Sequence, residues 1–461
     1  MNFVFLTLIL KDTIVALSTA PGRSGIGVVR LSGSRALEIT GRLICDQGFA
    51  FEPRRATLKK IFEPRSGELL DDAVITFFKS PSSFTGEDVI EISCHGSPVL
   101  LRQAIDSILY FDARLAEAGE FTLRALANGK MNLSQAEAVR DLINAQTVAA
   151  VQQAARQLGG ELSNQLQPLK DDLLDVIVVL ESTLEFVEDD LPDVAMDRIQ
   201  QKLSEVDSKL GALADTFRAG RLLREGLKVT LAGRPNVGKS SLFNCLIGQE
   251  RAIVTNIPGT TRDQILESLS IEGIPIALAD TAGVRHSADL VESLGVERTR
   301  RAITDSDLVI VVIDGSQPLT LEDHEVLSAV TESTHIIAFN KVDLETPDLS
   351  QLLDLPNTTI VRVSAKTGFG LDKLKKTIIS PFSSHKIENS GFLIADARHF
   401  DLLHRAQLEI ESSKCLIEER ASEEIILIGL HNSLRLLGEI TGETTSEDVL
   451  TRIFSTFCIG K

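Results

Sequence analysis

Residues 233–240 constrain the fold of this chain more than any other segment. They read Gly-Arg-Pro-Asn-Val-Gly-Lys-Ser, which matches the pattern G-x-x-x-x-G-K-[ST], and they join an apolar, strand-like run to a helix-like run. Such glycines let backbone N–H groups close around phosphate oxygens, while Lys239 reaches the β- and γ-phosphates and the Ser240 hydroxyl holds Mg²⁺. A glycine-rich turn without a ligand is the alternative, which the agreement of motif and context disfavours. The sequence therefore predicts a phosphate-binding loop in a doubly wound α/β domain.

Three further motifs follow apolar, strand-like runs. Residues 280–283 (Asp-Thr-Ala-Gly) can hold Mg²⁺ through water and contact a γ-phosphate. Residues 340–343 (Asn-Lys-Val-Asp) end in Asp343, whose carboxylate only accepts hydrogen bonds and so matches the N1–H and amino donors of guanine. Residues 364–366 (Ser-Ala-Lys) offer a backbone N–H to guanine O6. In this order the motifs resemble those of translation-factor-related G proteins, and they predict GTP as the nucleotide.

The segment between the loop and residue 280 supplies further polar groups. Thr261 is expected to give Mg²⁺ a second hydroxyl, and Asn236 offers a side-chain oxygen to a monovalent cation. Val284 stands where Ras-like proteins carry the glutamine that orients water, so catalysis needs another polar group and another positive charge. The predicted nucleotide-binding residues are Asn236, Val237, Gly238, Lys239, Ser240, Ser241, Thr255, Asn256, Ile257, Pro258, Gly259, Thr260, Thr261, Asp280, Thr281, Ala282, Gly283, Asn340, Lys341, Val342, Asp343, Ser364, Ala365 and Lys366.

The chain has 461 residues, a length that suits about three domains. Its hydrophobic pattern changes from one region to the next. Strand-like runs and turns with one helix-like stretch predict an N-terminal α+β module. A helical pattern follows, with Ser134 and Glu137 as a capping box, and it resumes after the α/β segment. We therefore expect a helical domain interrupted by an inserted α/β domain. The expected boundaries are 1–127 for the N-terminal domain, 128–222 and 381–461 for the helical domain, and 223–380 for the inserted domain.

Composition excludes several classes of protein. The formal net charge is −18, with 47 Lys+Arg against 65 Asp+Glu. This excludes a protein that binds nucleic acid through a broadly basic surface. The five cysteines are scattered and never spaced C-x-x-C, which excludes a zinc ribbon and suits a reducing cytosol. Residues 1–10 are apolar but too short to span a bilayer, and no basic residue precedes them. We expect a soluble, cytoplasmic protein with no membrane contact.

The flanks of the nucleotide motifs are also distinctive. The G-domain segments together resemble those of potassium-activated G proteins. Residues 21–33, 83–96 and 119–143, with the terminal Phe-Cys-Ile-Gly-Lys at 457–461, are similar to the MnmE (TrmE) family of tRNA-modification GTPases. The resemblance extends from about residue 12 to the last residue, and the terminal tetrapeptide is its most specific feature.

The resemblance implies a folate-binding N-terminal domain that also forms a homodimer. The positions that match the family's folate contacts are Arg30, Glu91, Lys130 and Lys461. A carboxylate suits the N–H donors of the pterin, and cations suit the glutamate tail or formyl oxygen of 5-formyl- or 5,10-methylenetetrahydrofolate. Taken singly, Glu91 could be a solvated strand residue and Arg30 a surface ion pair of little energetic weight.

The resemblance also assigns the missing catalytic groups of the G domain. Potassium would supply the positive charge, bound by Asn236, Thr255, Ile257 and Thr260, the middle two through backbone carbonyls. The family's water-orienting carboxylate matches Glu292, which could otherwise be an ordinary exposed helix residue.

Cys458 has three interpretations. A prenylation box is a poor match, because Gly460 takes an aliphatic position and Lys461 is an unusual last residue. A structural thiol is possible. The resemblance places Cys458 in the folate pocket, where Lys461 could favour its thiolate, and we expect a functional role that need not be nucleophilic. His95 and His286 lie near motifs but are expected to make local polar contacts.

Two positions depart from the family pattern. Ala118 stands where the family usually has proline, and Ser97 where it usually has glycine. These changes could alter the stiffness of loops at the folate pocket, while the charged contacts are retained.

The implied function is modification of C5 of the wobble uridine of certain tRNAs, carried out with the FAD-dependent partner MnmG (GidA) in a heterotetramer or larger assembly. Folate would donate the one-carbon unit, FAD and NADH would handle redox, and glycine or ammonium would supply nitrogen.

Two other classes of function remain open. A ribosome-assembly GTPase should carry a basic RNA-binding appendage, and none is evident. A self-sufficient folate methyltransferase would need its own redox site, and the N-terminal module has no FAD fingerprint.

Overall fold

The structure is a computed structural model that describes residues 12–185, 193–249, 266–280, 303–344, 359–382, 391–443 and 447–460. The chain divides into two compact units. The first unit contains Met1–Arg140, Gln157–Leu174 and His431–Lys461, and the second contains Asp141–Arg156 and Asp175–Leu430. Within the described ranges, every helix is too short or too polar to cross a bilayer.

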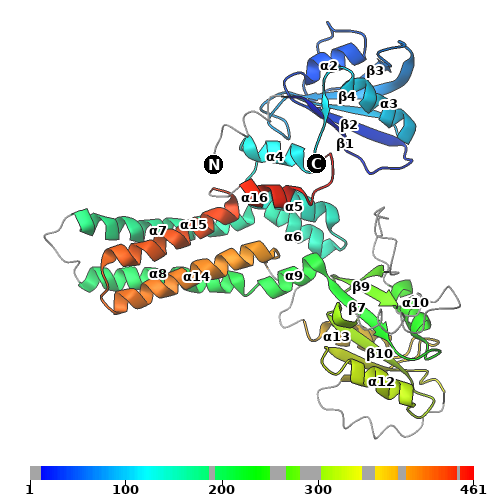
Figure 1. The fold of residues 1–461 in the computed structure, drawn as a ribbon, viewed down its shortest axis with the longest axis vertical. Coiled ribbons are helices and arrows are strands. Elements are labelled where there is room, and N and C mark those ends of the chain that lie inside the picture. Colours follow the sequence, from blue (N-terminus) through cyan, green and yellow to red (C-terminus); the bar gives the residue numbers. More distant parts are fainter. Residues whose placement is uncertain are drawn as a thin grey trace. The chain divides into compact units, whose positions relative to one another are not determined.

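The first unit is built on a mixed six-stranded sheet, drawn in blue to cyan in Figure 1. The strand order is β3-β4-β5-β2-β1-β6, with antiparallel neighbours except for the parallel pair β1 and β6. The strands are β1 Ile14–Leu17, β2 Ile26–Ser32, β3 Ala56–Phe62, β4 Leu69–Phe78, β5 Val89–His95 and β6 Arg114–Leu115.

Helices α2 (Ala36–Leu43) and α3 (Pro98–Leu109) cover one face of this sheet. Alternate residues of β2 and β5 are buried, because successive side chains of a strand point to opposite faces. The sequence predicted α3 but missed α2 and α4 (Glu120–Ala127), so the expectation of one helix in this module was wrong. Both missed helices are eight residues long, which is too short for a clear helical period.

Helix α5 (Leu133–Asn144) begins one residue earlier than its expected cap. The Asn132 side chain accepts the Gln135 N–H at 2.9 Å, and the Gln135 side chain accepts the Asn132 N–H at 3.0 Å. The capping box is therefore Asn132 with Gln135, and the prediction of Ser134 with Glu137 was wrong. Both predicted residues are instead buried inside the helix, because the apolar contact of Leu133 with α16 (Glu447–Phe454) draws this turn into the core.

The second unit contains a second six-stranded sheet, of order β12-β11-β10-β7-β9-β8. All its neighbouring strands are parallel except for β8, which pairs antiparallel with β9 at one edge. The strands are β7 Leu227–Ala232, β8 Leu266–Ile271, β9 Ile274–Asp280, β10 Leu308–Asp314, β11 His335–Asn340 and β12 Thr359–Arg362.

Helices cover both faces of this sheet. Helices α10 (Lys239–Gln249) and α13 (Leu371–Ile379) pack on one face, and α12 (Leu321–Ala329) packs on the other. All seven residues of β10 are buried, as a central parallel strand requires. The predicted doubly wound domain is confirmed.

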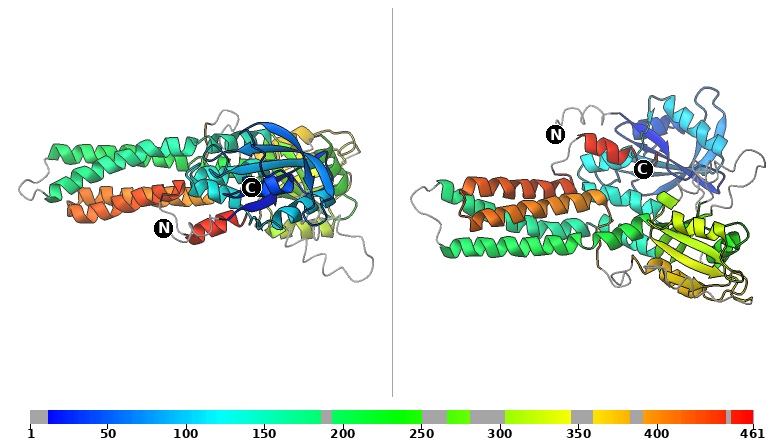
Figure 2. Two further views of the ribbon diagram at one scale, coloured as in Figure 1. Left: turned by 90° about the horizontal axis from the view of Figure 1, so that it is seen from above. Right: turned by 60° about the horizontal axis from the view of Figure 1, so that its bottom comes forward.

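The described part of the chain contains further helices. They are α6 Val148–Leu158, α7 Glu161–Glu185, α8 Asp193–Ala214, α9 Phe217–Glu225, α14 Ala397–Glu418 and α15 Glu423–Thr441. Helices α8 and α14 lie side by side along their length in Figures 1 and 2. Lys414 on α14 donates to Asp207 on α8 at 2.9 Å, and Gln407 donates to the same carboxylate at 2.9 Å.

The chain enters and leaves the α/β domain at adjacent points. Gly220 on α9 lies so close to the returning segment that a Cβ would meet the Ile394 carbonyl oxygen at 2.2 Å. Arg224, also on α9, pairs with Asp396 at 2.7 Å and with Asp141 at 3.0 Å. Burial alone would raise the pKa of Asp396, but His399 and Arg224 hold it well below its ordinary value. This junction is what an inserted domain needs, because its two ends must lie close together.

Candidate functional site

The turn between β7 and α10 has the backbone of a phosphate-binding loop. Gly233 and Gly238 have φ of 146° and 97°, in the region that favours glycine. A Cβ on Gly233 would meet the Val312 carbonyl oxygen at 2.4 Å, and one on Gly238 would meet Asn340 Nδ2 at 2.2 Å. Both glycines are therefore required by close packing as well as by conformation. Lys239, at the start of α10, donates from Nζ to the carbonyl oxygens of Gly233 at 2.7 Å and Arg234 at 2.8 Å.

The Asn-Lys-Val-Asp motif supports residues 236 and 237 of this loop. Asn340 donates from Nδ2 to the Val237 carbonyl oxygen at 2.9 Å. Lys341 donates from Nζ to the Asn236 carbonyl oxygen at 2.8 Å and to Asp314 at 2.7 Å. The carbonyl oxygens of Val237 and Asn236 are therefore both satisfied by side chains of this motif. Asn236 itself has a φ of 63°, and its backbone strain is held by this contact.

Asp314 ends β10 and was not predicted as a site residue. Burial alone would raise its pKa, but hydrogen bonds from Lys341 and Ser316 hold the pKa below its ordinary value. The carboxylate therefore stays ionised and fixes Lys341 beside the loop. Its signal in the sequence is its place at the end of an apolar strand, the same place that Asn340 takes on the next strand.

The side of the site that the sequence predicts to bind guanine joins the Asn-Lys-Val-Asp and Ser-Ala-Lys motifs. Ala365 donates its backbone N–H to Asn340 Oδ1 at 2.9 Å, and the Ser364 hydroxyl donates to Asp343 at 2.7 Å. The bond from Ser364 lowers the pKa of Asp343, which is exposed and keeps its charge. A cavity of about 230 Å³ lies beside them, lined by Val342, Asp343, Thr367 and Phe369. The sequence did not predict Thr367 or Phe369 here.

Some of the remaining predicted nucleotide-binding residues lie within the described ranges, and others lie outside them. Val237 is buried, while Ser240, Ser241 and Lys366 are exposed, and Asp280 ends β9 next to β7. Other candidates lie outside the described residues: Thr255, Asn256, Ile257, Pro258, Gly259, Thr260, Thr261, Thr281, Ala282, Gly283, Val284, His286, Glu292 and Lys461. Among the described residues, no group of three or more His, Cys, Asp or Glu side chains is arranged to hold a metal. A Mg²⁺ site built from hydroxyls and phosphate oxygens does not need such a group.

Arg30 and Glu91 are direct neighbours in the first unit. They face each other across β2 and β5, and Arg30 donates to one Glu91 oxygen from Nε at 3.0 Å and from Nη2 at 2.7 Å. The guanidinium lies 5.7 Å from the ring centres of both Phe84 and Phe121. The two side chains are 15% and 29% exposed, so the pair is neither a solvated surface contact nor fully buried.

Lys130 reaches the same loop as Arg30. Its Nζ donates to the Pro81 carbonyl oxygen at 2.9 Å, and Phe84 of this loop lies against Arg30. The structure therefore brings Arg30 and Lys130, two of the four predicted folate residues, to the loop of residues 79–88, and Glu91 pairs with Arg30. Phe121 is fully buried, so Phe84 is the ring of this pair that a planar heterocycle could contact while its N–H groups meet the Glu91 carboxylate.

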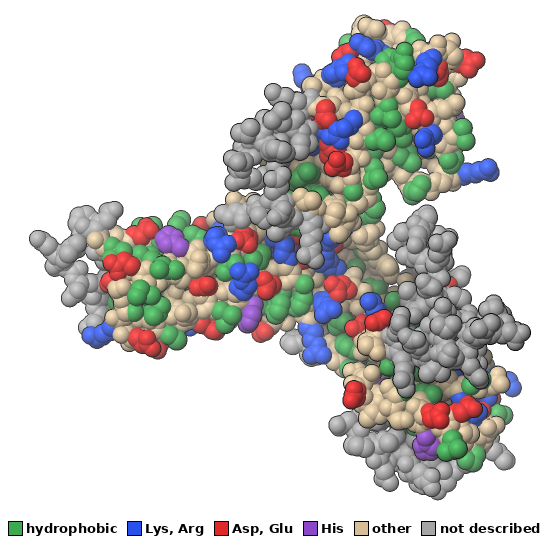
Figure 3. Space-filling view, viewed as in Figure 1, with side chains coloured by type: hydrophobic (Ala, Val, Ile, Leu, Met, Phe, Trp, Pro, Cys, Tyr) green, Lys and Arg blue, Asp and Glu red, His purple; other side chains and the backbone are tan. Residues whose placement is uncertain are grey.

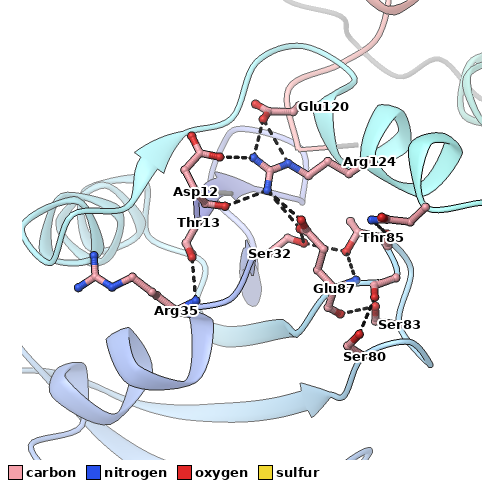
Figure 4. A network of polar contacts seen from close by, with 12 residues as sticks. Asp12, Thr13, Ser32, Arg35, Ser80, Ser83, Thr85, Glu87, Glu120 and Arg124 are labelled. Atoms are coloured by element: carbon pink, nitrogen blue, oxygen red, sulfur yellow. Dashed lines mark hydrogen bonds and ion pairs between the residues drawn. The ribbon is translucent and has the colours of Figure 1, made fainter. Parts of the chain in front are cut away.

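A buried ionic network anchors this loop (Figure 4). Arg124 of α4 is completely buried, and its guanidinium contacts Asp12 at 2.6 Å, Glu120 at 2.9 Å and Glu87 at 3.2 Å. Glu87 also accepts the Ser32 hydroxyl at 2.6 Å. A fully buried arginine is stable only when its charge and donors are matched, as they are here. Arg124 lies in the segment of residues 119–143 that resembles the family, but the sequence predicted no role for it.

The C-terminal tail docks within the first unit. Gly119 donates its N–H to the Cys458 carbonyl oxygen at 3.4 Å, and Ser18 donates its hydroxyl to the Gly460 carbonyl oxygen at 3.2 Å. Gly460 has a φ of 98°, and a Cβ there would meet the Leu17 carbonyl oxygen at 2.3 Å. The Cys458 residue is exposed. The tail thus ends beside β1, the strand next to the one that carries Arg30.

The two departures from the family pattern leave these contacts in place. Ala118 pairs with Ile459, and the hydrogen bond of that pair is donated by Gly119. Ser97 precedes α3 with a φ of −81°, which any residue adopts, whereas a Cβ on Gly96 would meet Ser24 Oγ at 2.2 Å. His95 makes the local polar contact expected of it, with its ring 2.7 Å from Asp71.

Two family profiles match the chain. The profile of the "MnmE helical domain" matches residues 133–458, and that of the "GTP-binding protein TrmE N-terminus" matches residues 13–130. Among solved structures, the G domain of the T. maritima FeoB iron transporter is 33% identical, with a TM-score of 0.27 over 33% of this chain and 97% of that one.

Curated relatives extend over nearly the whole chain. The tRNA modification GTPase MnmE of Koribacter versatilis is 44% identical over 456 residues, which cover 98% of this chain and 100% of that protein. The protein of the same name from Aquifex aeolicus is 43% identical over 453 residues, with the same coverage. With the phosphate-binding loop, the guanine-side motifs and the folded tail on one chain, these matches show that it belongs to the MnmE (TrmE) family.

Proposed function

We propose that this GTP hydrolase of the MnmE family modifies C5 of the wobble uridine of certain tRNAs in the cytoplasm. It would install a carboxymethylaminomethyl or aminomethyl group together with the FAD-dependent partner MnmG, using a tetrahydrofolate one-carbon unit. The observation that carries the proposal is the convergence of the phosphate-binding loop with the Asn-Lys-Val-Asp and Ser-Ala-Lys motifs, in a chain that matches tRNA modification GTPases over 98% of its length.

The described residues suit GTP. In the proposed complex Lys239, whose ammonium has three N–H donors and uses two of them on carbonyl oxygens, also donates to the β- and γ-phosphates, and Ser240 gives its hydroxyl to Mg²⁺. Asp343 accepts from the guanine N1–H and amino group, while the Ser364 bond orients its carboxylate. The backbone N–H groups of 236–240 face the phosphates because Asn340 and Lys341 hold the carbonyl oxygens of this loop.

Hydrolysis needs a charge and an oriented water in addition. We assign the charge to potassium, bound by Asn236, Thr255, Ile257 and Thr260, and the orientation of the water to Glu292. The support in the described residues is Asn236, which is exposed on the loop and has a φ of 63°. GTP hydrolysis would drive association and release of G domains across a homodimer.

The folate would lie in the first unit. Glu91 would accept from the pterin, while Arg30, Lys130 and Lys461 would meet the acidic tail or formyl oxygen. The support is the pairing of Arg30 with Glu91 next to Phe84, together with Lys130, which contacts the loop that carries Phe84. Folate supplies a one-carbon unit when bound. Cys458 lies on the C-terminal tail, where its carbonyl oxygen accepts from the Gly119 N–H. In this proposal FAD and NADH belong to the partner.

The surface charge fits a division of labour in tRNA binding. On the face shown in Figure 3, acidic and basic side chains are interspersed, and the net charge of the chain is −18. Phosphate contacts dominate affinity for nucleic acids, so we assign much of the tRNA affinity to the partner.

The test is reconstitution with tRNA lacking the modification. The purified chain, its FAD-dependent partner, GTP, K⁺, methylenetetrahydrofolate, NADH and glycine or ammonium should add the expected mass to the wobble nucleoside, detected by mass spectrometry. Omission of any one component, or the Arg30→Ala variant, should abolish the product. Addition of mass elsewhere, or without folate, would contradict the proposal.

A further inference from the structure

Helix α10 carries a thiol that contacts the Ser-Ala-Lys motif. Cys245, the seventh residue of the helix, donates from Sγ to the Ala365 carbonyl oxygen at 2.9 Å. Both residues are partly buried and pack against the same apolar core. A helix rises about 1.5 Å per residue, so the thiol lies roughly 9 Å along α10 from Lys239 at its start. One helix therefore reaches the phosphate-binding loop with its first turn and the Ser-Ala-Lys motif with its second.

The Ser-Ala-Lys motif is held from two sides. On one side it meets the Asn-Lys-Val-Asp motif, where Asn340 Oδ1 accepts the Ala365 N–H at 2.9 Å and Asp343 accepts the Ser364 hydroxyl at 2.7 Å. On the other side it meets α10 through the thiol of Cys245. The thiol is therefore the contact that fixes this motif against a different element of the fold.

These contacts form a ring of hydrogen bonds around the nucleotide motifs. Cys245 donates to the carbonyl oxygen of Ala365, whose own N–H donates to Asn340. The Asn340 side chain donates in turn to the Val237 carbonyl oxygen in the phosphate-binding loop, and this loop leads directly into α10. Hydrogen bonds that form a network reinforce one another. The sequence indicated no role for Cys245 in this network.

Packing alone is the alternative role for Cys245. A free cysteine behaves as a small apolar side chain whose S–H group is a weak donor. The sulfur, however, lies 2.9 Å from the carbonyl oxygen, closer than the separation of about 3.5 to 4.0 Å that apolar packing gives. Removal of the thiol would leave this partly buried oxygen without the donor, which costs more than the loss of a packing contact.

We propose that Cys245 is a positioning residue for base recognition. Its thiol holds the Ser-Ala-Lys motif against α10 and thereby keeps Asp343 and the backbone of residues 364–366 aligned with the guanine. The thiol acts through Ala365 and makes no contact with the nucleotide. The inference rests on the proposed binding of guanine at these motifs and adds a residue of α10 to its recognition.

The first test compares GDP binding by variants of the full chain. Cys245→Ala and Cys245→Val both remove the donor, one with less and one with more apolar volume, and each should raise the Kd by about three- to tenfold, the effect of one hydrogen bond. Cys245→Ser keeps a donor, so its Kd should stay within about twofold of wild type. Cys415→Ala, the same change at an exposed thiol of α14, is the control and should bind as wild type does.

Titration calorimetry separates positioning from general stability in this series. A variant that folds only in part shows a lower stoichiometry of GDP, because the folded fraction still binds normally. A variant that has lost the positioning contact shows a higher Kd at unchanged stoichiometry. Restoration of the Kd by serine, and not by valine, assigns the effect to the donated hydrogen.

A second measurement uses the reciprocity between the contact and the nucleotide. If the Cys245 contact strengthens GDP binding by some factor, GDP must strengthen the contact by the same factor. Alkylation of Cys245 requires the contact to open, so saturating GDP should slow this alkylation by about three- to tenfold. Peptide mass spectrometry of the wild-type chain measures the rate, and alkylation of Cys415 in the same sample should not change.

The outcomes distinguish this inference from the function on which it rests. If Asp343→Asn binds GDP as wild type does, guanine is not recognised at these motifs and the proposed base site is wrong. If Asp343→Asn binds weakly while Cys245→Ala and Cys245→Val bind as wild type does, the inference alone is overturned. It is also overturned if Cys245→Ser binds as weakly as Cys245→Val, because the effect would then come from packing, or if GDP leaves the alkylation rate of Cys245 unchanged.

Discussion

In the proposed function, base recognition depends on the exposed carboxylate of Asp343. The Ser364 hydroxyl donates to one Asp343 oxygen at 2.7 Å, and Asp343 lines a cavity together with Val342, Thr367 and Phe369. The hydrogen bond from Ser364 lowers the pKa of Asp343, so the carboxylate is ionised at neutral pH and can only accept.

Asp343→Asn should exchange the preferred base. The amide would offer donors where guanine also has donors, so GTP affinity should fall by roughly ten- to a hundredfold, as for loss of a charged hydrogen bond. Xanthosine triphosphate has an oxygen at that position and should bind the variant better than GTP. Titration calorimetry with both nucleotides tests this, with Asp372→Asn on α13 as the control. Unchanged preference for GTP would remove Asp343 from the base site.

At the scale of elements, helix α4 and the loop of residues 79–88 act as one piece. Arg124 ties α4 to Glu87 in the loop and to Asp12 before β1, while Asn128 donates to the Thr85 carbonyl oxygen at 2.7 Å. This piece carries Phe84 and Phe121, whose ring centres both lie 5.7 Å from the Arg30 guanidinium. The buried charges therefore support the shape of the candidate folate site without lying in it.

This arrangement predicts acid sensitivity of the N-terminal core. Burial alone would raise the pKa of Glu120, but hydrogen bonds from Arg114 and Arg124 hold it below its ordinary value of 4.5. A depressed pKa stabilises the fold above that value, and the contribution is lost as the pH falls through the folded pKa. The free energy of unfolding should decrease below about pH 5, and in Glu120→Gln its slope should be shallower by up to about 1.4 kcal/mol per pH unit.

The measurement can use Cys94, which is buried in this core. Urea titrations between pH 5 and 3, read by modification of Cys94 with a disulfide reagent that stays reactive in acid, report unfolding of this domain alone. Lys60→Gln removes a surface partner of Asp72 and serves as the control. Equal slopes for wild type and Glu120→Gln would contradict the assigned role of the network.

The whole molecule was predictable in outline because its strongest signals are local. The phosphate-binding loop, the buried strands and α3 are encoded by residues close in sequence, and their elements are confirmed. Arg124 with Glu87, and Arg234 with Asp323, join residues 37 and 89 positions apart, and single-sequence patterns contain no signal for such pairs. The capping box at α5 was misassigned although its signal is local, because Asn132 with Gln135 and Ser134 with Glu137 both match the pattern and the structure uses the first pair.

The matches to the MnmE family also favour one of the three functions that the sequence left open. They include residues 13–130 and 133–458, so the resemblance is not confined to a G domain shared with ribosome-assembly GTPases. The domain boundaries stay predictions, and so do the roles of Glu292, Cys458 and the potassium ligands.

The measurement that tests the account most directly is GTP hydrolysis by the purified full chain in K⁺ and in Na⁺ at equal ionic strength. We expect strong stimulation by K⁺ alone, abolished by Asn236→Ala and by Glu292→Ala, because the charge and the oriented water would then be missing. Lys366→Ala, outside the proposed cation site, should keep the stimulation even if it weakens nucleotide binding. Equal, slow rates in both salts would contradict the cation assignment and reopen the assembly-factor interpretation.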